Sequence, residues 1–190
     1  MNGTRAFLAL RLPAEATEAA SAVLAGLRER YGEREVKWVA PGNLHITLRF
    51  FGDLDAPGLA RARELTRAQD GAWEAISTGW RALGAFPSLR RIQVLWMDLA
   101  DEGGALRALA GEVEGQLVRA GFGRGDKPFT AHVTLGRVRR GARLAWSAES
   151  ESLTSPGPAF SITQMALMKS TLTPSGPIYT PLETAEAHNR

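Results

Sequence analysis

The sequence predicts an α+β fold in two lobes with antiparallel sheets. Strand and helix patterns follow one another in mixed order, without the strict alternation that is typical of a parallel sheet. Several predicted strands are separated by short turns, as in hairpins. The tetrapeptide His-x-Thr-Leu occurs once in each half of the chain, at His45 and at His132. We therefore expect a pseudo-duplicated, bilobal molecule.

The first half is expected to contain three strands and two helices. Residues 5–12 alternate in polarity well enough to form a strand. Pro13 then opens an Ala-rich helix over residues 14–30, and Gly32 ends it. A strand, a Pro-Gly turn and a second strand are predicted over residues 36–54, followed by a helix over residues 56–70.

The second half is expected to contain more strands and one helix. Its predicted elements are β-rich segments at 73–87 and 90–100, a helix over 104–120 that stops near Gly121, a strand over 129–138, a loop at 154–161, and a closing hairpin formed by 160–174 and 176–187. No stretch has the composition of a flexible linker. We therefore expect one bilobal catalytic domain over residues 1–190.

Composition narrows the classes of protein to consider. Hydrophobic residues make up 44% of the 190 residues and charged residues 23%, which is ordinary for a soluble globular domain. No apolar run approaches the roughly 20 residues that cross a bilayer, so we expect a cytoplasmic protein. The absence of cysteine excludes disulfides, thiolate metal sites and cysteine nucleophiles.

The basic residues are nearly all arginine. Of the 23 basic residues only Lys37, Lys127 and Lys169 are lysines, which leaves 20 arginines. A guanidinium group binds phosphate oxygens in bidentate geometry. The net charge of +3 by itself is more typical of a soluble surface than of a nucleic-acid interface.

The repeated tetrapeptide is the main functional signal. Two such occurrences would arise by chance with a probability of roughly 10⁻⁴ at ordinary residue frequencies. Residues two apart in a strand share one face, so His45 and Thr47 are expected to project together, and His132 and Thr134 likewise. Each half therefore presents one imidazole beside one hydroxyl.

Two imidazoles and two hydroxyls that converge on one point suit displacement at phosphorus. Near neutral pH one histidine can accept the proton of the nucleophile while the other donates a proton to the leaving oxygen. The threonine hydroxyls can hydrogen-bond the non-bridging oxygens, where charge collects in the transition state. The residues thus favour acid and base catalysis on a phosphate ester.

Other site chemistries fit less well. A zinc site usually takes three protein ligands, and the third histidine, His188, lies near the C-terminus. A metal held by His45, His132 and a carboxylate such as Asp53 stays open as an alternative, although we expect no metal and no cofactor. The sequence contains no G-x-S-x-G elbow and no Walker-type phosphate loop.

The chain resembles the two-histidine phosphoesterases over about residues 5–183. The resemblance is carried by "NLHITLRFFGDL" and "FTAHVTLGRV", with "VKWV", "GAFPSLRRIQVLW" and "GPIYTPL" in the same order. Within this superfamily the sequence is most similar to the RNA 2′,3′-cyclic phosphodiesterases, also called 2′-5′ RNA ligases. The resemblance implies two antiparallel sheets that face a central cleft, with helices outside.

The resemblance also implies an activity and roles for the motif residues. The expected reaction is hydrolysis of a 2′,3′-cyclic phosphate at an RNA end to a 2′-phosphate, with His45 as proton donor and His132 as proton acceptor. Thr47, Thr134 and Arg137 are implied to bind the phosphate. Simple alternation would place Arg137 opposite His132, so we expect a bulge or strand end at Gly136.

Further residues are candidates for substrate binding. Arg49 shares strand parity with His45, and Phe7 and Trp38 are candidates for stacking on a base, although a single aromatic in a strand is more often part of the core. Arg90 and Arg91 either contact upstream RNA phosphates or are solvated.

Two other functions remain open from the sequence. The same site could act on small cyclic nucleotides or 2′-5′ oligonucleotides, and the reverse ligation is expected to be minor. Alternatively, the chain could be an RNA-binding module that holds an end without cutting it. The expected partner is RNA that ends in a 2′,3′-cyclic phosphate, bound by a monomer without a membrane.

Overall fold

The structure is a computed structural model that describes residues 3–147, 150, 153, 159–174 and 176–188. The elements are β1 (Thr4–Arg11), α1 (Ala14–Glu35), β2 (Val36–Trp38), the 3-10 helix η1 (Pro41–Asn43), β3 (His45–Leu54), α2 (Ala56–Arg67), β4 (Ile76–Thr78), β5 (Trp80–Ser88), β6 (Arg91–Leu99), α3 (Ala105–Arg119), β7 (His132–Val138), β8 (Phe160–Ile162), β9 (Gln164–Thr173) and β10 (Gly176–Glu186). The predicted elements are found in the predicted order. Most of the loop predicted at 154–161 lies outside the described residues.

Helix α1 extends past the glycine that was predicted to end it. Gly32 has φ 70° and ψ 177°, which is not helical, and the helix resumes briefly as far as Glu35. A positive φ of this kind is readily adopted only by glycine. The prediction that Gly32 ends the helix is therefore correct for its regular part. A short kinked turn after Gly32 leads into β2.

The strands form an antiparallel sheet whose two halves meet at one residue pair. The strand order is β10-β9-β1-β3-β7-β6-β5, and β2 pairs with the end of β7 on the edge opposite β6. Between β3 and β7, Ile46 and Val133 are the one pair in register. The two predicted sheets are thus the two halves of this arrangement, and a separate two-stranded sheet joins β4 to β8.

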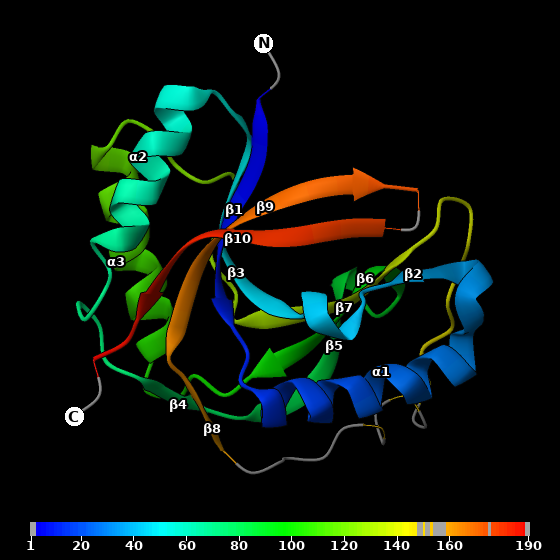
Figure 1. Cartoon of the computed structure of the whole chain (residues 1–190). Coiled ribbons are helices and arrows are strands. Elements are labelled where there is room, and N and C mark those ends of the chain that lie inside the picture. The colour runs from blue at the N-terminus through cyan, green and yellow to red at the C-terminus, as the bar shows by residue number, and fades with distance from the viewer. Residues whose placement is uncertain (1–2, 148–149, 151–152, 154–158, 175, 189–190) are drawn as a thin grey trace.

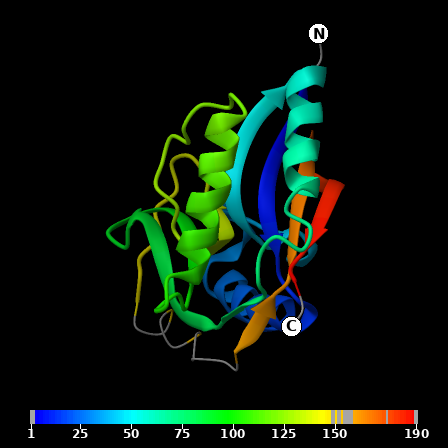
Figure 2. The same cartoon turned by 90° about the vertical axis from the view of Figure 1, so that its left-hand side faces the viewer.

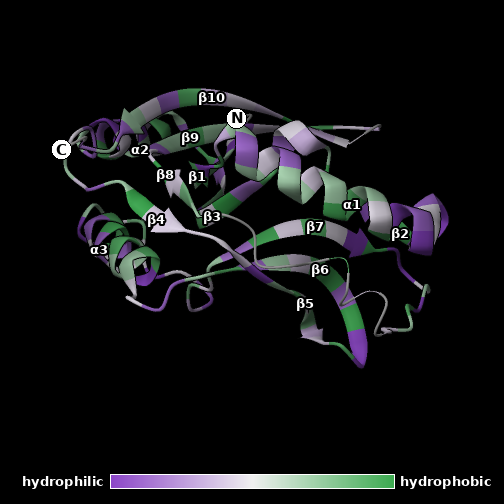
Figure 3. Cartoon of the chain, turned by 90° about the horizontal axis from the view of Figure 1, so that it is seen from below, coloured by the Kyte–Doolittle hydropathy of each residue, from purple (hydrophilic) through white to green (hydrophobic). Residues whose placement is uncertain are grey.

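Helices cover the outside of the sheet. Helices α2 and α3 lie side by side and pack against the half that contains β1 and β3, as Figures 1 and 2 show. Helix α1 packs against β2 and η1, and Figure 3 shows it alongside β7 and β2. In the part of the chain that the structure describes, no helix has the length and apolar character needed to span a membrane.

The hydrophobic core runs through the junction of the two halves. Ile46 and Val133 are fully buried there. They join one continuous cluster with Leu10 of β1 and Leu95 of β6. Because this buried pair lies inside the two motifs, packing of the core also fixes the position of the motif backbones.

Candidate active site

The two His-x-Thr motifs meet at the junction between the halves. Ile46 and Val133, the middle residues of the motifs, pair in antiparallel register and are buried. Side chains alternate along a strand, so the residues on either side of this pair project away from that core. These residues are His45, Thr47, His132 and Thr134, all partly exposed.

Each motif is followed by a β-bulge. In β3, Thr47 pairs with Ala9 and Arg49 pairs with Leu8, so that Leu48 is left without a partner in the register. In β7, Thr134 pairs with Trp96 and Gly136 pairs with Leu95, so that Leu135 is left out in the same way. A one-residue bulge reverses the side-chain alternation beyond it.

The bulge in β7 brings Arg137 to the histidine side of the sheet. Arg137 pairs with Val94, which shares a face of β6 with Trp96, the partner of Thr134. The charge of Arg137 lowers the pKa of His45 and that of His132, as expected of a cation near both rings. A bulge was predicted at Gly136 and is found one residue earlier.

The bulge in β3 has the opposite effect on Arg49. Its guanidinium group donates to both carboxylate oxygens of Glu114 in α3 at 2.6 Å, and to the carbonyl oxygens of Phe122 at 3.3 Å and Gly123 at 3.2 Å. Its side chain is only 11% exposed. The prediction that Arg49 shares the face of His45 is therefore wrong, because the bulge at Leu48 turns it toward the helices.

Trp38 belongs to the core. It is 8% exposed, and its indole Nε1 donates to the carbonyl oxygen of Gly32 at 3.0 Å. An ideal Cβ on Gly136 would lie 2.8 Å from the indole ring, so the ring packs directly on the glycine backbone. Trp38 was a candidate for stacking on a base, but its burial agrees with the core position that the sequence favoured for a single aromatic in a strand.

Phe7 lies beside the site but exposes little of its ring. Its centroid is 4.7 Å from that of His45, and the residue is 4% exposed. The structure thus brings Phe7 into contact with the imidazole, where it limits the access of water to one side of His45.

Main-chain carbonyl groups orient both imidazoles in the same way. His45 Nδ1 donates to the carbonyl oxygen of Asn43 at 2.7 Å, and His132 Nδ1 donates to that of Thr130 at 2.8 Å. A carbonyl oxygen can only accept, so Nδ1 carries a proton in each ring. The Nε2 atom of each histidine is then the one that is left to exchange a proton with a substrate.

Aromatic rings surround each histidine in a matching pattern. Besides Phe7, His45 contacts Tyr179 edge-on with centroids 5.5 Å apart. His132 contacts Phe86 at 5.1 Å and Trp96 at 5.8 Å, both edge-on. Sequence reasoning assigned no role to Tyr179, Phe86 or Trp96, although all three lie in the flanking strings "GPIYTPL" and "GAFPSLRRIQVLW" that carry the family resemblance.

Burial lowers the pKa of both histidines. For His45, burial is the largest cause, and the charges of His132 and Arg137 act in the same direction, while the hydrogen bond to Asn43 opposes them. For His132, burial again dominates and Arg137 adds to it. The effect of the His132 charge on His45 is what two rings near one another would produce.

Asp98 makes the two histidines electrostatically unequal. It is the cross-strand partner of His132, and its negative charge raises the pKa of that ring against the effect of burial. Asp98 also lies 3.8 Å from Arg81. The charges that act on His45 are both cationic, so His132 is the more basic of the two by this effect alone.

The remaining predicted residues lie away from the motifs. Asp53 is at the far end of β3 and pairs with Arg5 at 3.8 Å, so it does not join the histidines as a metal ligand. Arg90 and Arg91 are exposed at the turn between β5 and β6, and their contact with RNA stays a prediction. The backbone of His188 donates to Trp73, which fastens this part of the tail.

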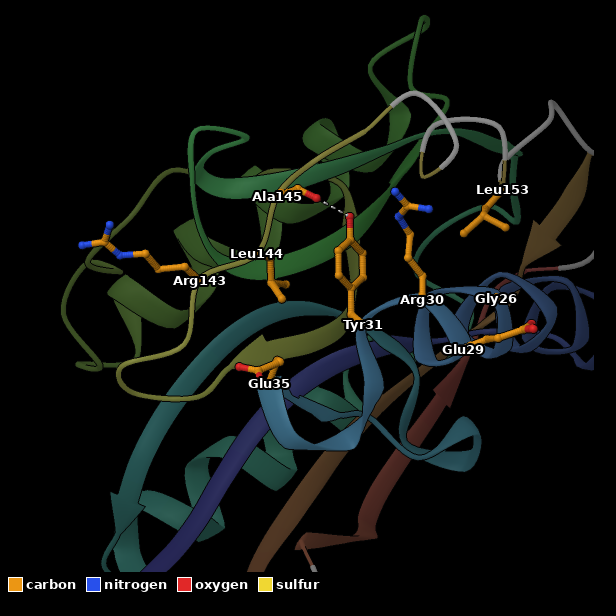
Figure 4. A pocket seen from close by; sticks show the side chains of 9 residues that line it. All are labelled: Gly26, Glu29, Arg30, Tyr31, Glu35, Arg143, Leu144, Ala145 and Leu153. Atoms are coloured by element: carbon orange, nitrogen blue, oxygen red, sulfur yellow. Dashed lines mark hydrogen bonds between the residues drawn. The ribbon is translucent and has the colours of Figure 1, made fainter.

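A hollow of about 840 Å³ lies elsewhere, between α1 and the segment after β7. Figure 4 shows the hydroxyl of Tyr31 directed at Ala145, whose carbonyl oxygen accepts its hydrogen bond at 3.0 Å. Glu29, Arg30 and Arg143 also line it. None of the lining residues belongs to either motif, so the hollow is separate from the two-histidine site.

Comparison with protein families confirms the resemblance. The family described as "LigT like Phosphoesterase" matches residues 10–96 and again 98–179. Each matched segment contains one His-x-Thr motif. The chain therefore belongs to the LigT-like phosphoesterases, a two-histidine phosphoesterase family.

Individual relatives match along most of their length. An RNA 2′,3′-cyclic phosphodiesterase of Archaeoglobus fulgidus is 37% identical over 84% of this chain and 89% of its own. Another of that name, from Methanothermobacter thermautotrophicus, is 32% identical over 94% of this chain and 96% of its own.

Solved structures have the same fold. A protein of Thermus thermophilus matches with a TM-score of 0.72 and 29% identity over 97% of this chain and 98% of its own. Escherichia coli LigT in complex with 3′-AMP matches with a TM-score of 0.76 and 22% identity over 98% of this chain and 99% of its own, which concerns the fold alone. The predicted α+β fold of this family is confirmed.

Proposed function

We propose that the chain hydrolyses RNA 2′,3′-cyclic phosphate ends to 2′-phosphomonoesters. One observation carries the proposal: two imidazoles, each oriented by a main-chain carbonyl, come from opposite halves of the chain and meet at the junction. The names of the relatives from Archaeoglobus fulgidus and Methanothermobacter thermautotrophicus support the substrate class.

The proposed reaction is one in-line displacement. Nε2 of His132 accepts a proton from water as the water oxygen forms a bond to phosphorus. The bond between phosphorus and the 3′-oxygen breaks, and Nε2–H of His45 donates its proton to that oxygen. The product is a 2′-phosphomonoester with a free 3′-hydroxyl, and proton exchange with solvent restores both rings.

The roles of proton donor and proton acceptor follow the family resemblance. The negative charge of Asp98 acts on His132, so it would stabilise the imidazolium that forms when His132 accepts the proton of water.

Thr47, Thr134 and Arg137 are proposed to bind the non-bridging oxygens. The two threonines lie beside the imidazoles, and the bulge at Leu135 turns Arg137 toward the same side. Hydrogen-bond donors that are already in place at the phosphate stabilise its charge in the transition state without reorganisation.

The reaction is proposed to need no metal, because two imidazoles supply both proton transfers. It is also proposed to occur within a single monomeric domain, since both motifs come from one chain. In the joining of a cyclic-phosphate end to a 5′-hydroxyl, that hydroxyl would take the place of water as the nucleophile at this site. Water competes with the hydroxyl, so ligation is expected to be minor.

Incubation of RNA oligomers that end in a 2′,3′-cyclic phosphate, followed by chromatography, tests the proposal. The expected product is the 2′-phosphate, formed equally in the presence of EDTA. His45→Ala and His132→Ala are each expected to lower kcat by about 10²–10⁴-fold. His188→Ala is the matched control and should keep full activity. Full turnover by either motif variant would exclude the mechanism, and binding without product would identify an RNA-binding module.

A further inference from the structure

An exposed aromatic side chain lies on the histidine side of the first half. Phe50 is 49% exposed. It pairs across the sheet with Phe7, whose ring contacts His45. Its neighbours in sequence face the other way, since Arg49 bonds Glu114 and the ring of Phe51 lies 5.0 Å from that of Phe122. Phe50 therefore projects on the same side as the site.

A cation already packs on this ring. The guanidinium carbon of Arg5 lies 4.7 Å from the centroid of Phe50, and the Arg5 side chain is 39% exposed. The charge of Arg5 also acts on Tyr179, which in turn contacts His45. Arg5 and Phe50 are thus continuous with the residues around the first imidazole.

The ring of Phe50 contributes little to the core. Phe51, next to it, packs among the buried residues under α2 and α3, whereas half of Phe50 faces solvent. Proteins that bind single-stranded nucleic acids often combine an exposed aromatic side chain with a cation. The base stacks on the aromatic ring, and the cation attracts the phosphate.

We propose that Phe50, with Arg5 against its ring, is a stacking platform for the penultimate nucleobase of the RNA substrate. The inference rests on the proposed function. Phe50 lies three residues beyond Thr47 along β3, or roughly 10 Å at about 3.3 Å per residue. With the cyclic phosphate held at His45 and Thr47, the terminal nucleoside occupies this interval and the next base reaches Phe50.

The platform is tested by comparing substrates of different length. For Phe50→Leu, the KM for a dinucleotide or trinucleotide that ends in a 2′,3′-cyclic phosphate is expected to rise about tenfold, as loss of one stacked base would produce. The kcat for these substrates should stay the same. The KM for a mononucleoside 2′,3′-cyclic phosphate should change less than twofold, since it has no second base. Phe50→Trp should keep the wild-type KM values.

Ile178→Ala is the matched control, because Ile178 is 56% exposed but is no aromatic ring. It should leave both KM values unchanged. If Phe50→Leu changes the KM for the mononucleotide and for the oligonucleotides equally, the proposed platform is wrong. It is also wrong if neither KM changes. Failure of the wild-type protein to hydrolyse any of these substrates would instead refute the proposed function.

Discussion

At the scale of single residues, each imidazole is oriented by the carbonyl of the residue two positions before it. The bond from His45 to Asn43 and the bond from His132 to Thr130 both occupy Nδ1. A change of protonation at Nε2 therefore leaves the ring in place. Asp98 is one difference between the two rings, because its charge acts on His132 and not on His45.

Asp98→Asn tests this difference. Removal of the carboxylate charge is expected to lower the pKa of His132 further, because the effect that raises it is lost. The pKa of His45 should change less, because Asp98 reaches that ring only through the charge of His132. NMR titration of the imidazole protons in both proteins measures the two values separately. An unchanged or raised pKa of His132 would show that Asp98 does not act on the ring.

The sequence predicted the parity of the motif residues but not that of the residues beyond them. His45, Thr47, His132 and Thr134 project together as period-two alternation requires. Tyr179 was missed because it reaches His45 from β10, and no local pattern links these distant segments.

At the scale of elements, the two bulges explain why alternation fails after each motif. Arg49 lies four residues after His45, so alternation places it on the same face and one bulge reverses this. Arg137 lies five residues after His132, so alternation places it opposite and the bulge again reverses this. Bulges depend on pairing with another strand, and a single strand's sequence does not specify them.

Gly136→Ala tests the close packing of β2 on β7. A Cβ on this residue would lie 2.7 Å from Cγ1 of Val36 and 2.8 Å from the ring of Trp38. The two strands would have to separate, so we expect a loss of about 1–3 kcal/mol in the free energy of unfolding, measured with urea. Gly103→Ala is the control, because its Cβ would meet nothing within 4 Å. Equal stability of the two variants would contradict the packing described for β2.

The Arg49–Glu114 pair links β3 to α3 and to the segment that leads to His132. Burial alone would raise the pKa of Glu114, but the bond from the Gly125 amide and the Arg49 guanidinium lower it overall. Glu114→Gln leaves the mostly buried guanidinium without a counter-charge. We expect the free energy of unfolding to fall by about 1–3 kcal/mol.

Glu112→Gln on the exposed side of α3 is the control for this change and should be neutral. Urea unfolding of both variants makes the comparison. If they are equally stable, the pair does not hold the helix to the sheet.

At the scale of the whole molecule, the two lowered histidine pKa values make stability depend on pH. The unfolded chain has histidine pKa values near 6.5, so it takes up protons before the folded chain as the pH falls. The free energy of unfolding should therefore fall from about pH 7.5 through about pH 6.5. This decline ends once the pH lies below the folded values.

Urea unfolding at a series of pH values between about 8 and 5 measures this dependence. In the double variant His45→Gln, His132→Gln, the free energy of unfolding should depend much less on pH over this interval. A wild-type stability that rises as the pH falls through this interval would contradict the lowered pKa values.

The fold class was predictable because local patterns define each strand and helix. How the halves are joined was not, because Ile46 and Val133 are far apart in the sequence and pair at a single position. The pairing of β4 with β8 was not predictable either, because Ile76 and its partner Ile162 are also far apart in the sequence. Neither segment alone carries a signal for its partner.

Because the halves pair only at Ile46 and Val133, the direction of each imidazole and the gap between the two imidazoles have different structural causes. The direction of each ring depends on its own half, through a carbonyl two residues away. The gap between the rings depends on the angle at which the halves meet. A small rotation about this point would open or narrow the gap while each ring kept its own carbonyl bond. Substitutions far from either motif would therefore change the distance between the rings by changing that angle.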